Sequence, residues 1–194
     1  MNTIRRTHKP SKETEKDFYQ THPLMVVALK EWLIDNDFSK DMTILDPCCG
    51  EKVIGNELRA YFNNIIEIDK FPKEGEGIDF MQYIPDRKID ICISNVPYSN
   101  KYNFINKQME IANYVFSLFP LNISNYNMFH REFEDMPEFV GKLQMAPKMF
   151  LSQTTEFNAS GTAQYCWYMW DKNNNTDFSK TWYKDLRVIK ELYK

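Results

Sequence analysis

The sequence predicts an α/β fold with a doubly wound, mostly parallel sheet, and three observations support this prediction. A short apolar run at residues 43–45 enters a tight turn and then a helical pattern at residues 53–62, the opening unit of such folds. A second apolar run, residues 65–69, ends in acids, and a third, residues 90–93, ends in a polar turn. Polar strand ends predict a ligand site at the carboxyl edge of the sheet.

The composition fits one domain with a substantial core. The chain has 194 residues, of which 43% are hydrophobic and 15% aromatic. No apolar run approaches the roughly 18 residues that a membrane span needs, and the polar, charged N-terminus is unlike a signal peptide. We therefore expect a cytoplasmic protein. The net charge of −3 carries no overall nucleic-acid signature, so any DNA binding must use local basic patches.

The four cysteines predict reduced thiols and no metal site. Cys48 and Cys49 are adjacent, which is not the spacing of metal ligands. Cys92 and Cys166 lie inside apolar runs, where buried thiols are expected.

The chain opens with a charged segment and a helix. Residues 1–16 carry five Lys and Arg and predict a flexible basic arm, either solvated or in contact with phosphates. Thr21 as N-cap and Pro23 in the first turn favour a helix of about a dozen residues. Phe18 and Tyr19 stand at its entrance, where a hydrophobic staple is the simplest structural role. The apolar positions recur at helical spacing: Leu24, Val27, Ala28, Trp32 and Leu33.

Two acids stand at the ends of the first two predicted strands. Asp46 opens the turn Asp-Pro-Cys-Cys-Gly, which ends at Gly50 and brings backbone N–H groups to the carboxyl edge. Glu67 follows 21 residues after Asp46, and an acid at about that offset accepts hydrogen bonds from ribose hydroxyls in dinucleotide folds. A solvated acidic strand end is the alternative interpretation.

The third strand leads into Asn95, Val96, Pro97 and Tyr98. Asn95 offers a side-chain acceptor, and Pro97 both restricts the residue before it and lacks an N–H. Tyr98 offers a flat face on which a planar group can stack. This arrangement predicts a site that holds a planar NH2 group, although an ordinary strand-to-loop turn has the same composition.

The remaining pattern completes a single domain. A short element begins at Asp79 and Phe80, and the last two strands are expected to form an antiparallel pair at a sheet edge. The expected domain covers residues 17–171, and residues 172–194 form a C-terminal tail that packs on it or trails from it. The other expected elements are a helix at 104–112, a strand at 114–121, a polar, aromatic segment at 122–138 with helical capacity at 128–133, and strands at 142–151 and 162–171.

The order and spacing of these signals resemble the class I S-adenosylmethionine-dependent methyltransferases over residues 17–171. Within them, Asn-Val-Pro-Tyr resembles the Asn-Pro-Pro-Tyr motif of small adenine-N6 DNA methyltransferases of phages and mobile elements, with valine at its second position. The resemblance implies a Rossmann-like fold with a seven-stranded, mostly parallel sheet and an antiparallel edge strand. It also implies S-adenosylmethionine as cofactor, DNA as partner and no metal.

The resemblance assigns roles residue by residue. The segment from Phe18 to Thr21, Tyr19 included, resembles the part that contacts the methionine end of the cofactor, and the turn with Asp46, Cys48 and Gly50 matches the one that holds its amino-acid end. Glu67 matches the acid on the ribose, with Asp69 as second choice; Asp79 and Phe80 match the residues at the cofactor's adenine. Asn95 and the Val96 carbonyl match the acceptors of the substrate amine, with Pro97 between them and the stacking Tyr98.

Two departures from the family pattern leave other functions open. Lys52 replaces the second glycine of the usual Gly-x-Gly turn, and few residues remain for a target-recognition domain. Residues 126–139 and 158–161 are then candidates for sequence readout, or ordinary surface loops. Three interpretations remain: methylation of DNA adenine, methylation of RNA adenine or a protein glutamine, and a degenerate fold that binds nucleic acid or protein.

Overall fold

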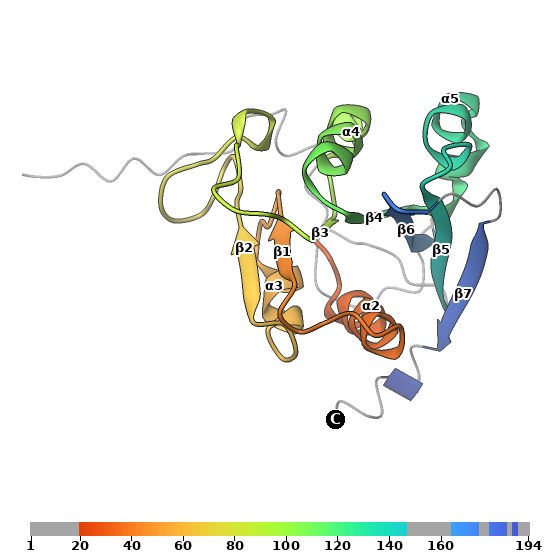
Figure 1. The fold of residues 1–194 in the computed structure, drawn as a ribbon, viewed down its shortest axis with the longest axis horizontal. Helices are drawn as coiled ribbons and strands as arrows, with labels where there is room; N and C mark the ends of the chain where they lie inside the picture. Colours follow the sequence, from red (N-terminus) through yellow and green to blue (C-terminus); the bar gives the residue numbers. More distant parts are fainter. Residues whose placement is uncertain (1–19, 147–163, 175–178, 186–187, 190–194) are drawn as a thin grey trace, which may run out of the picture.

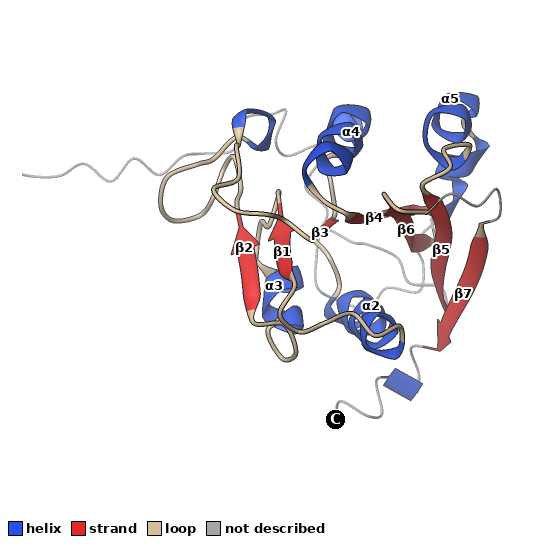
Figure 2. Ribbon diagram, in the orientation of Figure 1, coloured by secondary structure: helices blue, strands red, loops and turns tan. Residues whose placement is uncertain are grey.

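The computed structural model describes residues 20–146, 164–174, 179–185 and 188–189, which form three layers. A central sheet has α2 (Pro23–Asp35) and α3 (Val53–Leu58) on one face. The opposite face is covered by α4 (Lys101–Ile111) and the short α5 (Asn127–Phe129) (Figures 1 and 2). Single turns complete the helical part: η1 (Phe80–Gln82), η2 (Tyr98–Asn100), η3 (Leu121–Asn125) and the π-helical η4 (His130–Glu134).

The described residues form a seven-stranded sheet in the order β2-β1-β3-β4-β6-β5-β7. Its first four strands are parallel, and β6 runs antiparallel to both of its neighbours. The connections reverse direction at β1, which lies between β2 and β3, so the carboxyl ends of β1 and β3 border the crevice where such folds bind ligands. The strands are β1 (Thr43–Asp46), β2 (Asn64–Glu67), β3 (Ile91–Ser94), β4 (Tyr114–Pro120), β5 (Phe139–Ala146), β6 (Tyr165–Asp171) and β7 (Lys180–Asp185).

The predicted fold class is confirmed, but the antiparallel strand is not at the edge. β5 and β6 form the expected antiparallel pair, yet β6 lies between β4 and β5, and β7 adds the outer strand from the segment predicted as a tail. Burial explains the order. Six of the seven β6 residues are buried, as an interior strand requires, whereas no β7 residue is buried and β7 carries Lys180 and Lys184, which suit an edge.

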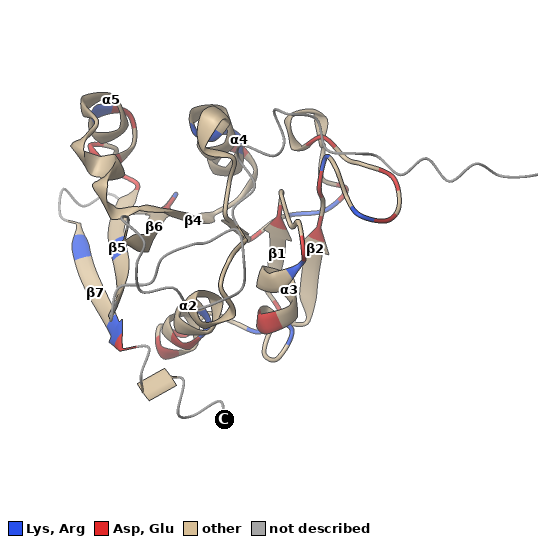
Figure 3. Ribbon diagram, turned by 180° about the vertical axis from the view of Figure 1, so that it is seen from behind, with Lys and Arg blue, Asp and Glu red and all other residues tan. Residues whose placement is uncertain are grey.

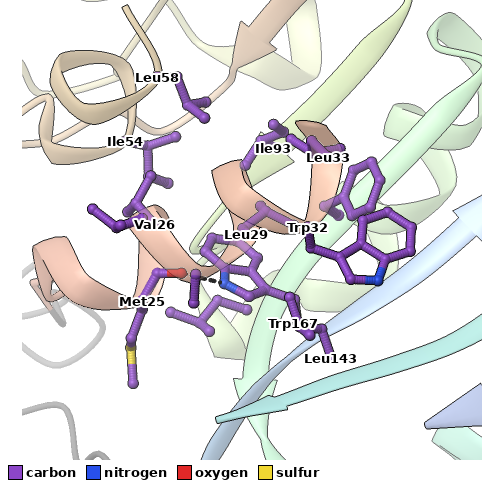
Figure 4. Packing of buried hydrophobic residues seen from close by; sticks show 14 of the residues in the cluster. Met25, Val26, Leu29, Trp32, Leu33, Ile54, Leu58, Ile93, Leu143 and Trp167 are labelled. Atoms are coloured by element: carbon purple, nitrogen blue, oxygen red, sulfur yellow. Dashed lines mark hydrogen bonds between the residues drawn. The ribbon is translucent and has the colours of Figure 1, made fainter. Parts of the chain in front are cut away.

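Helix α2 is fixed to the sheet along most of its length. Met25, Val26, Ala28, Leu29 and Leu33 are fully buried, and Figure 4 shows several of them packed toward Trp167 and the strands. The Trp167 indole Nε1 donates to the carbonyl oxygen of Met25 at 2.9 Å, which ties the first turn of the helix to β6. The start of α2 is therefore a rigid part of the molecule.

The N-cap of α2 is His22, and the prediction of Thr21 at this position is wrong by one residue. The imidazole Nδ1 of His22 accepts from the Leu24 N–H at 3.2 Å, and Pro23 occupies the first turn as predicted. Capping by His22 leaves the Thr21 hydroxyl available for a contact with β3's turn, described below. Helix α3 is also shorter than expected, because it ends at Leu58 and residues 59–61 form a turn.

The opposite face is packed by aromatic rings. Phe80 lies against Phe104 of α4, with ring centroids 5.2 Å apart, and Phe129 contacts Phe133 and Tyr168. These contacts pack η1 on α4 and hold α5 on β6. Among the described residues, no helix has the length and apolarity to cross a membrane.

Candidate functional site

The turn after β1 is bound to the end of β2. Asp46 is the last residue of β1, and its Oδ1 accepts from the Cys48 N–H at 3.3 Å. The Gly50 N–H donates to Oδ2 of Asp69 at 2.9 Å, and the Cys49 N–H donates to the Ile68 carbonyl oxygen. These contacts form a backbone cradle with two acidic side chains at the carboxyl edge of the sheet (Figure 3 marks the acids at the ends of β1 and β2).

Asp46 is the most unusual charged group of this cradle. It is fully buried, and its Oδ2 has no hydrogen-bond partner among the described residues. Burial raises the pKa of Asp46 to about 8, and the neighbouring carboxylates of Glu67 and Asp69 contribute in the same direction. A buried carboxylate with an open acceptor position favours a cation or an N–H donor beside it.

Lys52 occupies a backbone conformation that suits glycine. Its φ is +60° and its ψ is +23°, in the left-handed region, and Gly50 in the same turn has φ +46°. A residue with a Cβ is disfavoured there by roughly 1–2 kcal/mol. The departure noted in the sequence, a lysine in place of the second glycine, is thus a point of backbone strain, while the Lys52 side chain is exposed.

A partly buried thiol joins the first turn to the turn after β3. The Sγ of Cys48 lies 2.7 Å from the hydroxyl of Ser94, the last residue of β3, and donates to the carbonyl oxygen of Asn95 at 3.4 Å. Burial raises the pKa of the Cys48 thiol, so the neutral form is the one that makes these contacts. Cys48 therefore acts as a spacer between the two turns.

The side-chain amide of Asn95 is held from two sides. Its Nδ2 donates to the hydroxyl of Thr21 at 3.3 Å, and its Oδ1 accepts from the Tyr98 hydroxyl at 3.2 Å. Pro97 has φ −58° and ψ +121°, which starts the tight turn η2 and directs Tyr98 back toward Asn95. Val96 between them is buried.

Tyr98 belongs to an aromatic group at the same edge. Its ring lies 6.4 Å from that of Tyr165, with an angle of 26° between the planes, and 5.9 Å from that of Phe119. Tyr165 pairs with Pro120 at the carboxyl end of β4. The edge thus combines amide acceptors with flat rings, which suits a planar, hydrogen-bonding ligand.

Contacts link five of the predicted site residues, and Gly50, Val96 and Pro97 lie in the same two turns. Thr21, Asp46, Cys48, Asn95 and Tyr98 form one chain of contacts, and Asp69 rather than Glu67 binds the Gly50 N–H. Phe18 and Tyr19 lie outside the described residues.

Glu67 is turned toward α3. Its Oε2 accepts from Nη2 of Arg59 at 2.6 Å, and a Cβ at Gly55 would overlap its Oε1, so the carboxylate lies against the helix. Asp79 caps η1 through the Met81 N–H and pairs with Lys70 at 2.8 Å; that hydrogen bond lowers its pKa. Phe80 is buried against α4.

Sequence reasoning missed Ser94 and ranked Asp69 second. A polar residue at the end of an apolar run was the available signal for Ser94, and it faces Cys48 only because β1 and β3 are neighbours. The described residues contain no group of three His, Cys, Asp or Glu that could hold a metal ion.

Comparisons with known proteins identify the fold. No protein-family model and no curated protein matches the sequence. A putative RNA methyltransferase from Pyrococcus horikoshii is 16% identical, with a TM-score of 0.63 over 86% of this chain and 91% of that one. A putative class I S-adenosylmethionine-dependent methyltransferase from Listeria monocytogenes is 14% identical, with a TM-score of 0.59 over 93% and 73%.

A larger protein shares the same fold. The methyltransferase subunit of a type I restriction-modification system from Streptococcus thermophilus is 10% identical, with a TM-score of 0.61 over 87% of this chain and 47% of that one. At these identities the likeness concerns the fold alone. The protein therefore has the Rossmann-like fold of class I methyltransferases.

Proposed function

We propose that this protein is an S-adenosylmethionine-dependent methyltransferase that methylates N6 of adenine in DNA. The observation that carries the proposal is the amide of Asn95, held by Thr21 and Tyr98 at the end of β3 and tied through Cys48 to the turn of the buried Asp46. The oxygen of Asn95 can accept from a planar amine, and the carboxylate of Asp46 can bind a cationic methyl donor.

The acidic cradle after β1 fits the amino-acid end of the cofactor. The buried Oδ2 of Asp46 is an open acceptor for an ammonium group. Gly50 belongs to the same turn, and Thr21 contacts the turn after β3, which Cys48 joins to it. S-adenosylmethionine carries such an ammonium, and it supplies a methyl group activated on a sulfonium. Phe18, Tyr19 and the Lys52 ammonium complete the proposed surroundings of the methionine part.

The contacts lead us to assign the sugar hydroxyls to Asp69 rather than Glu67. Asp69 accepts from the backbone of the Gly50 turn, while Oε2 of Glu67 accepts from Arg59 and its Oε1 is buried against Gly55 of α3. Each carboxylate oxygen has more than one acceptor position, so Asp69 can bind a hydroxyl and keep its backbone contacts. Asp79 and Phe80 remain the proposed residues at the cofactor's adenine.

The chemistry required of the Asn95 turn is to orient a weak nucleophile. The lone pair of an exocyclic adenine amine is delocalised into the ring. Acceptance of its two N–H bonds by Asn95 Oδ1 and the Val96 carbonyl oxygen favours a pyramidal nitrogen whose lone pair is directed at the methyl donor. The N–C bond would form as the carbon–sulfur bond of the methyl donor breaks, which leaves a neutral thioether. The amine becomes acidic in this step, and the proton held by these oxygens would pass to water. Positioning and fixed dipoles supply the catalysis.

The Tyr98 ring is proposed to hold the adenine outside the duplex. A base inside the helix is out of reach of the Asn95 turn, so it must be flipped at a cost of a few kcal/mol. Stacking on an aromatic ring returns roughly 1–3 kcal/mol of that cost. Tyr98→Ala should therefore weaken substrate engagement more than it slows transfer from bound substrate.

The test is methyl transfer by an Asn95→Ala variant. We expect no incorporation of labelled methyl groups into DNA, because the side-chain acceptor is lost, and nearly unchanged S-adenosylmethionine binding by calorimetry. Asn103→Ala, at an exposed position of α4, is the matched control and should keep wild-type activity. Equal activity in the Asn95→Ala protein would refute the site assignment.

RNA is the second candidate substrate, favoured by the similarity to the putative RNA methyltransferase. The same site would hold the amine of an RNA adenine, because the proposed acceptors at Asn95 and Val96 and the Tyr98 ring contact the base and not the sugar. Parallel assays with double-stranded DNA, single-stranded DNA and RNA separate the two. Transfer to RNA alone would replace DNA as the proposed substrate.

A further inference from the structure

We infer that Thr21 is a positioning residue, which orients the Asn95 amide so that its oxygen and not its nitrogen faces the substrate amine. The inference rests on the proposed function and changes the role of Thr21, which the sequence assigns to cofactor contact. It is carried by the hydrogen bond from Asn95 Nδ2 to Thr21 Oγ1, 3.3 Å long, between residues 74 positions apart.

The two ends of an asparagine amide have opposite hydrogen-bonding character. The carbonyl oxygen accepts, whereas the NH2 group only donates. An inverted amide would point two donors at a substrate amine that is itself a donor, and the acceptor needed for the reaction would be lost. A partner that accepts from Nδ2 therefore determines whether the side chain is competent.

Thr21 is built to be such a partner. Its hydroxyl oxygen can accept, and the residue is 8% exposed, so water competes little for the bond. On the other side, the Tyr98 hydroxyl donates to Oδ1 at 3.2 Å. The amide nitrogen of Asn95 thus donates to Thr21, and the amide oxygen accepts from Tyr98.

The backbone that carries Thr21 is rigid. His22 caps α2, and the Met25 N–H donates to the His22 carbonyl oxygen at 2.9 Å. The Met25 carbonyl oxygen in turn accepts from Trp167 of β6. The residue that follows Thr21 thus begins a helix that is tied to the sheet, which favours a defined place for the Thr21 hydroxyl beside Asn95.

The kinetic test compares Thr21→Val with Thr21→Ser in the full-length protein. Valine keeps the branched shape and removes the acceptor, and serine keeps the acceptor. With tritiated S-adenosylmethionine and mixed-sequence DNA that lacks adenine methylation, we expect Thr21→Val to lower kcat about fivefold to tenfold, the loss of one hydrogen bond. KM for DNA and Kd for S-adenosylmethionine should stay within twofold, and Thr21→Ser should restore kcat.

A second readout does not depend on activity. The side-chain NH2 signals of Asn95 in a ¹⁵N NMR spectrum can be assigned by their disappearance in Asn95→Ala. We expect Thr21→Val to shift these signals and to speed their exchange with solvent, and Thr21→Ser to leave them near the wild-type positions. A merely structural role of Thr21 would not be rescued selectively by the hydroxyl.

The outcomes separate the inference from the proposed function. Wild-type kcat or unchanged Asn95 signals in Thr21→Val would overturn the positioning role. A loss confined to cofactor affinity would return Thr21 to cofactor contact. A wild-type protein that methylates neither DNA nor RNA would refute the proposed function, and the NMR comparison would still decide whether Thr21 holds the amide.

Discussion

Two carboxylates with largely covered side chains, one at the end of β1 and one in η4, have opposite surroundings. Asp46, at the end of β1, has an oxygen without a partner among the described residues, and burial raises its pKa to about 8. Glu134, in η4, pairs through Oε1 with Lys142 and Ser124, and through Oε2 with His130. Although burial raises the pKa of Glu134, these hydrogen bonds together lower it below its ordinary value.

The difference in hydrogen-bond partners indicates that Asp46 belongs to a ligand site and that Glu134 belongs to a structural cross-link. The hydroxyl of Ser124 also contacts Tyr168, so the Glu134 cluster joins the segment after β4 to β5 and β6 and leaves nothing for a ligand to satisfy. Asp46 is removed from water more completely and has no cation beside its second oxygen among the described residues. A satisfied buried charge stabilises the fold, and an unsatisfied one indicates where a ligand completes it.

The largest expected effect comes from Asp46→Asn, measured as stability against pH. The folded pKa of about 8 lies above the unfolded value near 4, so ionisation of Asp46 destabilises the protein. The free energy of unfolding of the wild type should fall by several kcal/mol as the pH rises from about 4 to about 8, because each pH unit between the two pKa values costs on the order of 1.4 kcal/mol. The variant should lack this fall.

Denaturant unfolding at pH 5 and pH 8 measures this difference, with Asp41→Asn at an exposed position as control. Asp46→Asn should bind S-adenosylmethionine at least tenfold more weakly than the wild type, because a charge-assisted hydrogen bond to the cofactor is lost. Wild-type binding should tighten as the pH rises toward 8, since the carboxylate must ionise to accept the ammonium. If the free energy of unfolding changes with pH in the same way for the wild type and Asp46→Asn, the ionisation of Asp46 does not destabilise the fold.

Lys142→Met tests the satisfied member of the comparison. It removes the cation 2.7 Å from Glu134, whose side chain is 8% exposed, and leaves that carboxylate with Ser124 and His130 as partners. Breaking a buried pair in this way costs about 3 kcal/mol, measured as the free energy of unfolding in urea. Activity of the remaining folded protein should be unchanged.

The matched control is Lys184→Met, which breaks the more exposed pair with Asp35 and should cost less than about 1 kcal/mol. If both variants lose the same small amount of stability, the Glu134 cluster is no cross-link. The contrast between Asp46 and Glu134 would then depend only on the burial of Asp46.

The sequence predicts the parts of this architecture that depend on local pattern. Apolar runs locate β1 and β3 to within a residue or two, and the polar residues after them locate the site. The place of β7 beside β5 was not predictable, because an edge strand with two lysines has the composition of a solvated tail.

Long-range geometry explains what the sequence leaves undecided within the site. The choice between Glu67 and Asp69 depends on Arg59, which draws Glu67 onto α3, and on the Gly50 N–H, which binds Asp69. The bond between Thr21 and Asn95 joins two widely separated positions, and no local pattern encodes it. The clearest functional signal, an unsatisfied buried oxygen, is a property of the folded chain only.

The smallest expected effect concerns strain in the turn that carries Asp46. Lys52→Gly should relieve the left-handed conformation and raise the free energy of unfolding by about 0.5–1 kcal/mol, after the greater freedom of glycine in the unfolded chain is subtracted. Thermal unfolding should show a rise of a few degrees at most. Lys52→Ala keeps the Cβ and the strain, so it should bring no gain.

The same pair of variants decides what Lys52 does to the cofactor. Because its side chain is exposed and its backbone strained, we expect calorimetry to show micromolar S-adenosylmethionine binding by the wild type and similar or slightly weaker binding by both variants, through loss of the ammonium. Binding by Lys52→Gly alone would mean that the lysine closes the site. The unsatisfied carboxylate of Asp46 would then be a remnant of a methyltransferase, and the fold would serve as a binding module.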